Sequence, residues 1–152
     1  MYQRILVPVD GSATSEAGLS EAIKLAQLTG ATLRLVHVLD LMPYAGGYDV
    51  INVYFTDLTP FLREAGQKVL QGAQDRVAAA GLKLEGKLLE TFGGRVSDVI
   101  LDEAKSSNAE LIVIGTHGRR GIGRLVMGSD AEQVLRQSPV PVLLVRGKPA
   151  GA

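Results

Sequence analysis

The sequence predicts an α/β protein, a doubly wound parallel sheet with helices on both faces. Short apolar segments alternate along the chain with longer segments of helical periodicity, in the order β-α-β-α-β-α-β-α-β. The clearest unit lies near the end. An apolar run at residues 111–114 stops at Gly115, a glycine- and arginine-rich loop follows, and a helical pattern leads to the last apolar run, Val140 to Val145. A buried strand that ends in glycine is typical of parallel sheets, so five parallel strands are expected.

Length and composition fit one domain. The chain has 152 residues, of which 46% are hydrophobic, and we expect one domain over residues 1–147 with a flexible tail over residues 148–152. Its 16 basic and 16 acidic residues give a net charge of +0, so no global field favours nucleic acid or an anionic membrane. The absence of cysteine excludes disulfides and Cys-based zinc sites. No apolar run approaches the roughly 20 residues of a membrane span, and no signal peptide is expected, which predicts a cytoplasmic protein.

Residues 3–9 predict the first strand, which is buried and rich in β-branched side chains. Pro8 lies near its end, where a missing backbone donor is tolerated. A turn follows, in which either Asp10 or Ser12 can cap the first helix. That helix is expected to stop at Gly30, because glycine readily adopts the left-handed conformation of a helix end.

Residues 32–39 predict the second strand, and the segment after it is the least regular part of the chain. This segment, Leu39 to Phe55, holds four of the seven aromatic residues together with Pro43 and two glycines. It leaves the second strand at the edge where ligands bind in such sheets. We therefore interpret it as a loop that covers the ligand site. A packed surface excursion or a dimer contact is the alternative interpretation.

The remaining elements follow from periodicity and from helix-stop signals. A long helix is predicted over residues 57–80, a strand with polar alternate positions over 82–91, a helix over 95–106 and a short helix over 129–136. The polar alternation of the strand at 82–91 indicates a face or an edge that meets water. The long helix is expected to bury one face, made of Leu58, Phe61, Leu62, Ala65, Val69, Ala73 and Val77.

The loop at residues 116–127 has the chemistry of an anion cradle. Glycine lets backbone N–H groups approach a phosphate closely, and a helix N-terminus attracts anions. Ser129 stands where a helix should begin and Glu132 lies three residues on, which is the pattern of a capping box. A capping box needs no ligand, however, and loop arginines are often solvated, so these residues alone leave phosphate binding open. The glycines and arginines of this anion cradle are Gly115, Gly118, Gly121, Gly123, Gly128, Arg119, Arg120 and Arg124.

The spacing of three glycines and a serine carries a resemblance. Gly115, Gly118, Gly128 and Ser129 match the pattern G-x2-G-x9-G-[ST], while the P-loop and Rossmann patterns are absent. The opening segment ILVPVDGS and the closing segment SPVPVLLVR support the same resemblance. On these motifs the chain resembles the universal stress protein family over essentially its whole length, in the ATP-binding branch that carries the glycine pattern. The resemblance implies a Rossmann-like sheet of strand order 3-2-1-4-5.

That order places the ligand where the strand order reverses, between the first and fourth strands. Asp10 and Gly115, about a hundred residues apart, would meet there. The resemblance implies that Val9, Asp10 and Val38 frame the adenine and ribose, and that the glycines, Arg119 and Ser129 surround the ribose and phosphates. A capping role for Asp10 is the alternative. The full expected set is Pro8, Val9, Asp10, Val38, Ile114, Gly115, Thr116, Gly118, Arg119, Gly128, Ser129 and Asp130.

Asp130 departs from the family pattern, in which an uncharged residue commonly follows the serine. An acidic residue suits the first turn of a helix, but it repels a triphosphate unless a cation bridges the two. Mg²⁺ or Mn²⁺ takes carboxylate and phosphate oxygens together. We therefore expect either a metal-dependent ATP site or an Asp130 side chain that points away.

No catalytic constellation can be argued from the residues. His37 is expected to pack within its strand, and His117 lies in the loop, where it could contact a phosphate. The predicted function is ATP- or adenine-nucleotide-dependent regulation in a stress response, with an unknown protein partner. The alternatives are a dimeric interaction module with an idle site, or a weak ATPase or autokinase, with slow ATP hydrolysis or self-phosphorylation at Ser129 or Thr116. The resemblance also implies a homodimer through the edge formed by Val140 to Val145.

Overall fold

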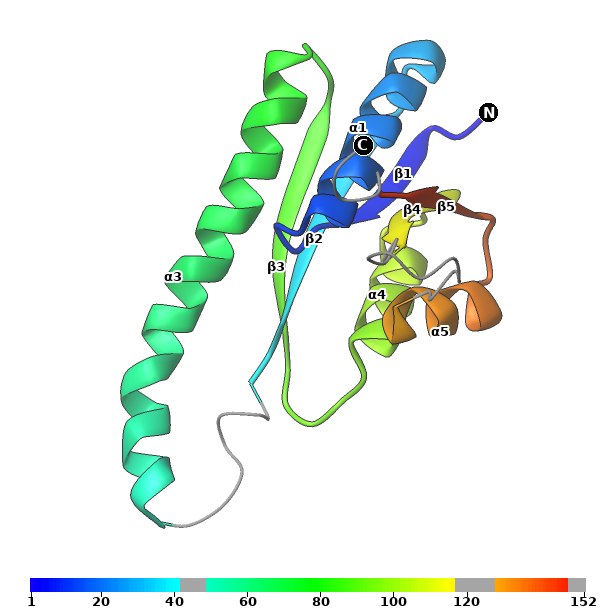
Figure 1. Cartoon of the computed structure of the whole chain (residues 1–152). Coiled ribbons are helices and arrows are strands. Elements are labelled where there is room, and N and C mark those ends of the chain that lie inside the picture. The colour runs from blue at the N-terminus through cyan, green and yellow to red at the C-terminus, as the bar shows by residue number, and fades with distance from the viewer. Residues whose placement is uncertain (42–48, 117–127, 148–152) are drawn as a thin grey trace.

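Five parallel strands form one sheet in the computed structural model, in the order β3-β2-β1-β4-β5 (Figure 1). The structure describes residues 1–41, 49–116 and 128–147, and for residues 49–57 it describes the backbone path only. The strand order and the parallel pairing confirm the expected doubly wound sheet. The strands are β1 (Arg4–Pro8), β2 (Thr32–Asp40), β3 (Leu84–Thr91), β4 (Leu111–Thr116) and β5 (Val142–Arg146).

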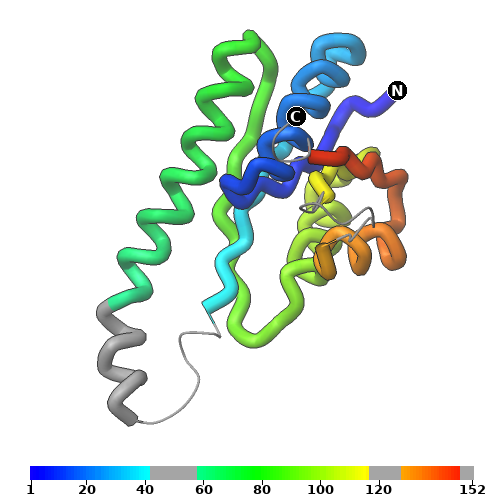
Figure 2. Tube along the Cα trace, viewed as in Figure 1, coloured from blue at the N-terminus to red at the C-terminus, as the bar shows by residue number. Residues whose placement is uncertain are grey.

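Two helices cover each face of the sheet. Helices α1 (Ala13–Thr29) and α3 (Asp49–Ala79) pack on one face, and α4 (Val96–Ser106) and α5 (Ser129–Gln137) pack on the other (Figures 1 and 2). Each connection between successive strands contains one of these helices, which packs over a face of the sheet, as parallel pairing requires. None of the helices in the described part of the chain combines the length and apolar character of a membrane crossing.

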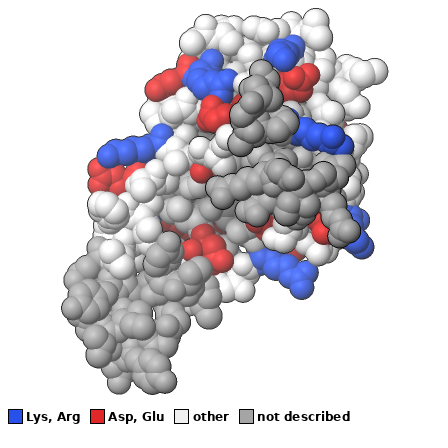
Figure 3. Space-filling view, in the orientation of Figure 1, with Lys and Arg blue, Asp and Glu red and all other residues white. Residues whose placement is uncertain are grey.

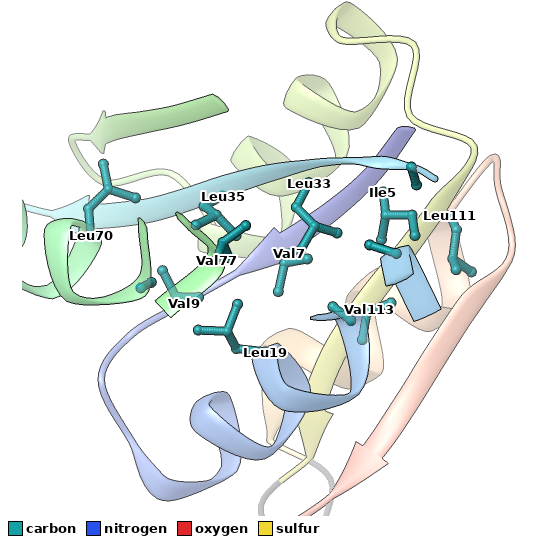
Figure 4. Packing of buried hydrophobic residues seen from close by; sticks show 14 residues of the cluster. Ile5, Val7, Val9, Leu19, Leu33, Leu35, Leu70, Val77, Leu111 and Val113 are labelled. Carbon is teal, nitrogen blue, oxygen red and sulfur yellow. The ribbon is translucent and has the colours of Figure 1, made fainter. Parts of the chain in front are cut away.

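The core has two layers because successive side chains of a strand point to opposite faces. On β1, Ile5 and Val7 point toward α1 and α3, where Leu19 is fully buried (Figure 4). Leu6 belongs instead to the layer packed against α4 and α5. The charged side chains lie outside these layers. Lys and Arg stand beside Asp and Glu at several places on the face seen in Figure 3, in keeping with the balanced net charge.

The prediction of a loop over Leu39 to Phe55 is wrong at both ends. Strand β2 continues to Asp40, and α3 already begins at Asp49, whereas residues 42–48 lie outside the described part. The helix also runs through Pro60, a residue that costs a helix interior one hydrogen bond and normally marks a first turn. The predicted tail, residues 148–152, lies outside the described residues as well.

The buried face of α3 also differs from the prediction. Leu58 and Phe61 are 42% and 69% exposed, because the first turns of α3 extend past the end of β2 and have no sheet beneath them (Figure 1). Contact with the sheet is made further along the helix. The residues that the helix buries there are Gly66, Leu70, Ala73 and Val77.

An ionic cluster fixes α4 to the sheet at the end away from its first turn. The Glu103 side chain is 5% exposed, and its Oε1 accepts hydrogen bonds from Arg34 Nε (3.0 Å) and Nη2 (2.6 Å) of β2. Lys87 Nζ of β3 lies 3.3 Å from Glu103 Oε2, and Arg34 also reaches Glu85 at 2.7 Å. Burial of Arg34 opposes its charge, but the hydrogen bonds that Arg34 donates to Glu103 and Glu85 outweigh burial and raise the pKa of Arg34 above its ordinary value.

Candidate functional site

A pocket of about 300 Å³ opens at the carboxyl ends of β1, β2 and β4. The strand order reverses between β1 and β4, so the pocket lies at the switch point where ligands bind in doubly wound sheets. Its size is at the lower end of the range of small-molecule sites. The lining residues are Pro8, Val9, Asp10, Ser12, Thr14, Ser15, Val36, His37, Val38, Val96, Ile100, Ile114, Gly115, Gly128, Ser129, Asp130 and Ala131.

The lining has an apolar part and a polar part that come from different elements. Most of the apolar side chains belong to the core layer beneath α4 and α5. The polar ones come from the turn before α1, from the first turns of α1 and α5, and from His37 of β2. A flat apolar group therefore fits one part of the pocket, while hydroxyl and phosphate groups fit the other. The apolar lining residues of the layer beneath α4 and α5 are Val36, Val38, Val96, Ile100, Ile114 and Ala131.

The turn between β1 and α1 is held by its own polar groups. Gly11 has a φ of 80°, a left-handed conformation that favours glycine, and it places Ser12 as the N-cap of α1. Ser12 Oγ accepts the N–H of Ser15 at 3.2 Å, and Asp10 Oδ1 accepts the N–H of Ser12 at 2.8 Å. Ser12 is thus the cap, and Asp10 supports the turn with one carboxylate oxygen. The Asp10 side chain is exposed, so its second oxygen can meet a ligand.

His37 does more than pack within its strand, contrary to expectation. Its Nδ1 lies 2.7 Å from the carbonyl oxygen of Val9, and since a carbonyl only accepts, Nδ1 is the donor. The half-buried ring lines the pocket. The sequence contained one usable signal, because His37 lies near the end of the second strand, which was predicted to end at the edge of the sheet where ligands bind.

At the end of β4, Gly115 allows α1 to approach the sheet. A Cβ on Gly115 would lie 2.1 Å from the carbonyl oxygen of Thr14, so no other residue fits without a backbone shift. Gly18 faces the same contact from the helix side, where a Cβ would lie 3.0 Å from Gly115 N. The first turn of α1 is thereby packed against the end of β4, and this contact forms one side of the pocket.

The capping box predicted at α5 is not formed. Gly128 is the N-cap and Ser129 is the first helical residue, and no side chain of a described residue makes the capping hydrogen bond. The Glu132 carboxylate turns instead to Arg136, one turn along, at 2.8 Å. Because Ser129 already has helical geometry, its N–H is one of the first-turn donors that a helix leaves without an internal partner. Both Ser129 and Asp130 line the pocket.

The structure brings most of the predicted site residues together. It also adds residues that sequence reasoning did not assign to the site, chiefly the hydroxyl residues Thr14 and Ser15 of α1 and the apolar pair Val96 and Ile100 of α4. In the sequence, these residues cannot be told apart from ordinary helix-capping and core residues. Thr116 is not among the lining residues; it is 3% exposed, and its hydroxyl donates to the Val145 carbonyl at 3.4 Å. His117, Gly118, Arg119, Arg120 and Arg124 lie outside the described residues. The predicted residues found in the lining are Pro8, Val9, Asp10, Val38, Ile114, Gly115, Gly128, Ser129 and Asp130.

Two carboxylates, Asp10 and Asp130, are the charged side chains among the described lining residues. Within the same described part of the chain, no group of three or more His, Asp and Glu side chains gathers in a way that could hold a metal ion.

The comparisons with known proteins agree with this geometry. The model of the universal stress protein family matches residues 1–146. A universal stress protein of Methanocaldococcus jannaschii is 30% identical over 151 residues, which cover 96% of this chain and 83% of that protein. The crystal structure of a family member from Burkholderia pseudomallei is 35% identical over 95% of this chain and 96% of its own, with a TM-score of 0.75. A universal stress protein of Archaeoglobus fulgidus, solved in complex with dAMP, is 28% identical over 95% of this chain and 98% of its own, with a TM-score of 0.66. The sequence pattern, the strand order and these matches agree, and the chain belongs to the universal stress protein family.

Proposed function

We propose that this protein binds an adenine nucleotide, with ATP as the first candidate, and that nucleotide binding regulates an unidentified protein partner in a stress response in the cytoplasm. The pocket at the switch point carries the proposal, because an apolar wall and two helix N-termini meet in it. The relative solved with dAMP supports the same ligand class.

The two parts of the pocket suggest how the nucleotide lies. The base would pack against the apolar wall, between Val38 of β2 and Ile100 of α4. The second carboxylate oxygen of Asp10 would accept a ribose hydroxyl, since a carboxylate can only accept. The phosphates would lie at the first turn of α5, where the N–H and hydroxyl of Ser129 can donate and the helix dipole favours negative charge. We also assign Gly118 and Arg119 of the glycine-rich loop to the ribose and phosphates.

Calorimetric titration with ATP and Mg²⁺, after a check for co-purified nucleotide, tests the proposal. The wild-type protein is expected to bind, and Ser129→Ala and Asp10→Asn are each expected to weaken binding about ten- to a hundredfold through the loss of a hydrogen bond to a charged group. Asp75→Asn is the matched control, because Asp75 is exposed on α3, outside the pocket. A folded, nucleotide-free sample that binds no adenine nucleotide would refute the proposal.

Asp130 gives a separate prediction about the metal. If Mg²⁺ or Mn²⁺ bridges Asp130 and the phosphates, wild-type affinity for ATP falls when EDTA removes the metal, whereas Asp130→Asn binds ATP with little metal dependence. The exposed Asp102 of α4 provides the control substitution Asp102→Asn. An Asp130→Asn protein with unchanged metal dependence would show that Asp130 points away from the phosphates.

A dimeric interaction module with an idle site is the second candidate function, and one observation favours its dimer. Strand β5 is an edge of the sheet, and Leu143 on it is 38% exposed. An edge strand offers backbone groups to a second copy. Light scattering at micromolar protein is expected to give the mass of a dimer, and Leu143→Lys is expected to shift the mass toward a monomer. A monomeric wild-type mass would contradict this arrangement.

Enzymatic turnover remains a minor part of the proposal, limited to slow hydrolysis or self-phosphorylation. Of the two candidate acceptor hydroxyls, Ser129 lines the pocket and is exposed, while Thr116 is buried beside β5. The geometry therefore favours Ser129 over Thr116 as the acceptor.

A further inference from the structure

Side chains from two different elements hold both polar ends of one peptide group, the peptide between Val9 and Asp10. Its carbonyl oxygen, on Val9, accepts a hydrogen bond from His37 Nδ1 of β2 at 2.7 Å. Its N–H, on Asp10, donates to Ser15 Oγ of α1 at 3.0 Å. A peptide is planar, so fixing its two ends fixes the orientation of the whole plane.

This peptide lies just beyond the regular hydrogen bonding of the sheet. Strand β1 ends at Pro8, and the last backbone contact to β2 is the N–H of Val9, which donates to Val36 O at 2.8 Å. On the other side stands Gly11 in a left-handed conformation, which allows rotations that other residues resist. Without His37 and Ser15, neither neighbour would prevent the Val9–Asp10 peptide from turning.

We propose that His37 and Ser15 are positioning residues that clamp the Val9–Asp10 peptide and thereby aim the Asp10 carboxylate at the ribose hydroxyls of the nucleotide. The inference rests on the proposed function. Asp10 has only one other restraint among the described contacts, the bond from Ser12 N–H to its Oδ1. The peptide plane fixes the N–Cα bond from which the Asp10 residue continues, and the bond to Ser12 N–H holds one carboxylate oxygen, so together they limit the directions open to the free oxygen.

Packing alone does not explain the choice of histidine. The ring edge of His37 lies close to α3, where a Cβ on Gly66 would come within 3.2 Å of His37 Cδ2. A ring without a donor fills the same space and keeps that contact. His37→Phe therefore removes the clamp while retaining the packing. His37→Asn does the reverse, since its Nδ2 can occupy the place of Nδ1 but leaves a gap beside Gly66.

The test uses two measurements of the clamp, with urea unfolding as a check on stability, on the wild type, His37→Phe, His37→Asn and Ser15→Ala. The first is hydrogen exchange of the Asp10 amide by NMR in the nucleotide-free protein. The second is the ratio of affinities for ATP and for 2′,3′-dideoxy-ATP, which lacks both ribose hydroxyls. The wild type is expected to favour ATP about tenfold, the size of a hydrogen bond to a charged group. His37→Phe and Ser15→Ala are expected to exchange the Asp10 amide faster and to reduce this preference to about twofold, while His37→Asn stays near the wild type in both measurements.

The two readouts separate the possible failures. If the wild type binds no nucleotide, the proposed function fails, and the amide exchange still shows whether the clamp exists. If the wild type prefers ATP and His37→Phe keeps the full preference, the clamp does not aim Asp10 and the inference is overturned. A purely structural role of His37 would lower the midpoint of urea unfolding in both His37 variants and leave the ratio unchanged, which also overturns the inference.

Discussion

Gly115→Ala is expected to destabilise the protein by about 3 kcal/mol, the upper range for forcing extra atoms into a packed interior. The added Cβ would lie 2.1 Å from Thr14 O, 2.5 Å from Thr14 C and 3.1 Å from Ser15 N. All three are backbone atoms, so no rotation of a side chain relieves the overlap. Strand β4 is paired on both sides, and α1 is 17 residues long, so relief requires one whole element to move.

Gly72→Ala is the matched control for this prediction. Gly72 lies within α3, and a Cβ there meets nothing within 4 Å. The same substitution is therefore expected to stabilise the protein by up to about 1 kcal/mol through helix propensity. Urea unfolding of the two variants beside the wild type measures both effects. Equal stability of Gly115→Ala and the wild type would mean that α1 does not pack on β4 as described.

This prediction changes how the glycine pattern should be interpreted. Gly115 is its first member, and the resemblance assigns it to the nucleotide. In the structure its side-chain position is filled by the first turn of α1, the element that brings Ser12 and Ser15 to the pocket. Loss of nucleotide binding in Gly115→Ala would thus report a displaced helix. Ser129 and Asp10, whose side chains line the pocket and are exposed, are the better probes of ligand contact.

The sheet was predictable because it depends on local patterns. Most strands are short apolar runs followed by a glycine or a turn, the strand at 82–91 shows alternation instead, and each helix shows its own periodicity, so the order of elements needs no distant contact. The switch point followed from the strand order that the resemblance implies. Asp10 and Gly115 are therefore found at the pocket as expected.

The features that were missed depend on contacts between residues far apart in the chain. The bond from His37 to Val9 joins residues 28 positions apart through a side chain and a carbonyl, which no periodicity reveals. The apolar pair of α4, Val96 and Ile100, belongs to a helix face that forms both the core and the pocket, and a hydrophobic pattern does not separate the two uses. At α5 the pattern was misleading, because Gly128 supplies the cap position that Ser129 was predicted to occupy.

Glu103→Gln is expected to cost about 3 kcal/mol of stability, since it leaves buried positive charge without its partner. The carboxylate is 5% exposed and the Arg34 side chain 22% exposed, so little water can replace the lost contacts. Arg34 would keep only Glu85, which is 59% exposed and screened by solvent. Lys87 is half exposed and can turn to water, so most of the cost falls on Arg34.

Glu132→Gln is the matched control, because it removes the same charge from an exposed pair with Arg136 on one helix. That pair is expected to contribute no more than about 0.5 kcal/mol. Urea unfolding at low salt and at high salt distinguishes the two sites, since salt screens the exposed pair and hardly reaches the buried one. Equal costs for both variants would show that the Glu103 cluster is as well solvated as a surface pair.

A double variant tests whether the ionic cluster itself stabilises the fold, or whether the cost of Glu103→Gln comes only from leaving Arg34 without its partner. Replacing both main partners, in Arg34→Met/Glu103→Leu, removes the buried charges together, and the stability is then expected to return close to that of the wild type. The ATP affinity of the double variant then distinguishes two roles of the cluster. Glu103 lies on the helix that carries Val96 and Ile100 of the apolar wall. If the cluster only holds α4 in place, the double variant should bind ATP as the wild type does, because the helix remains packed on the sheet. If its affinity falls while its stability is restored, the charges also set the position of α4 relative to the pocket.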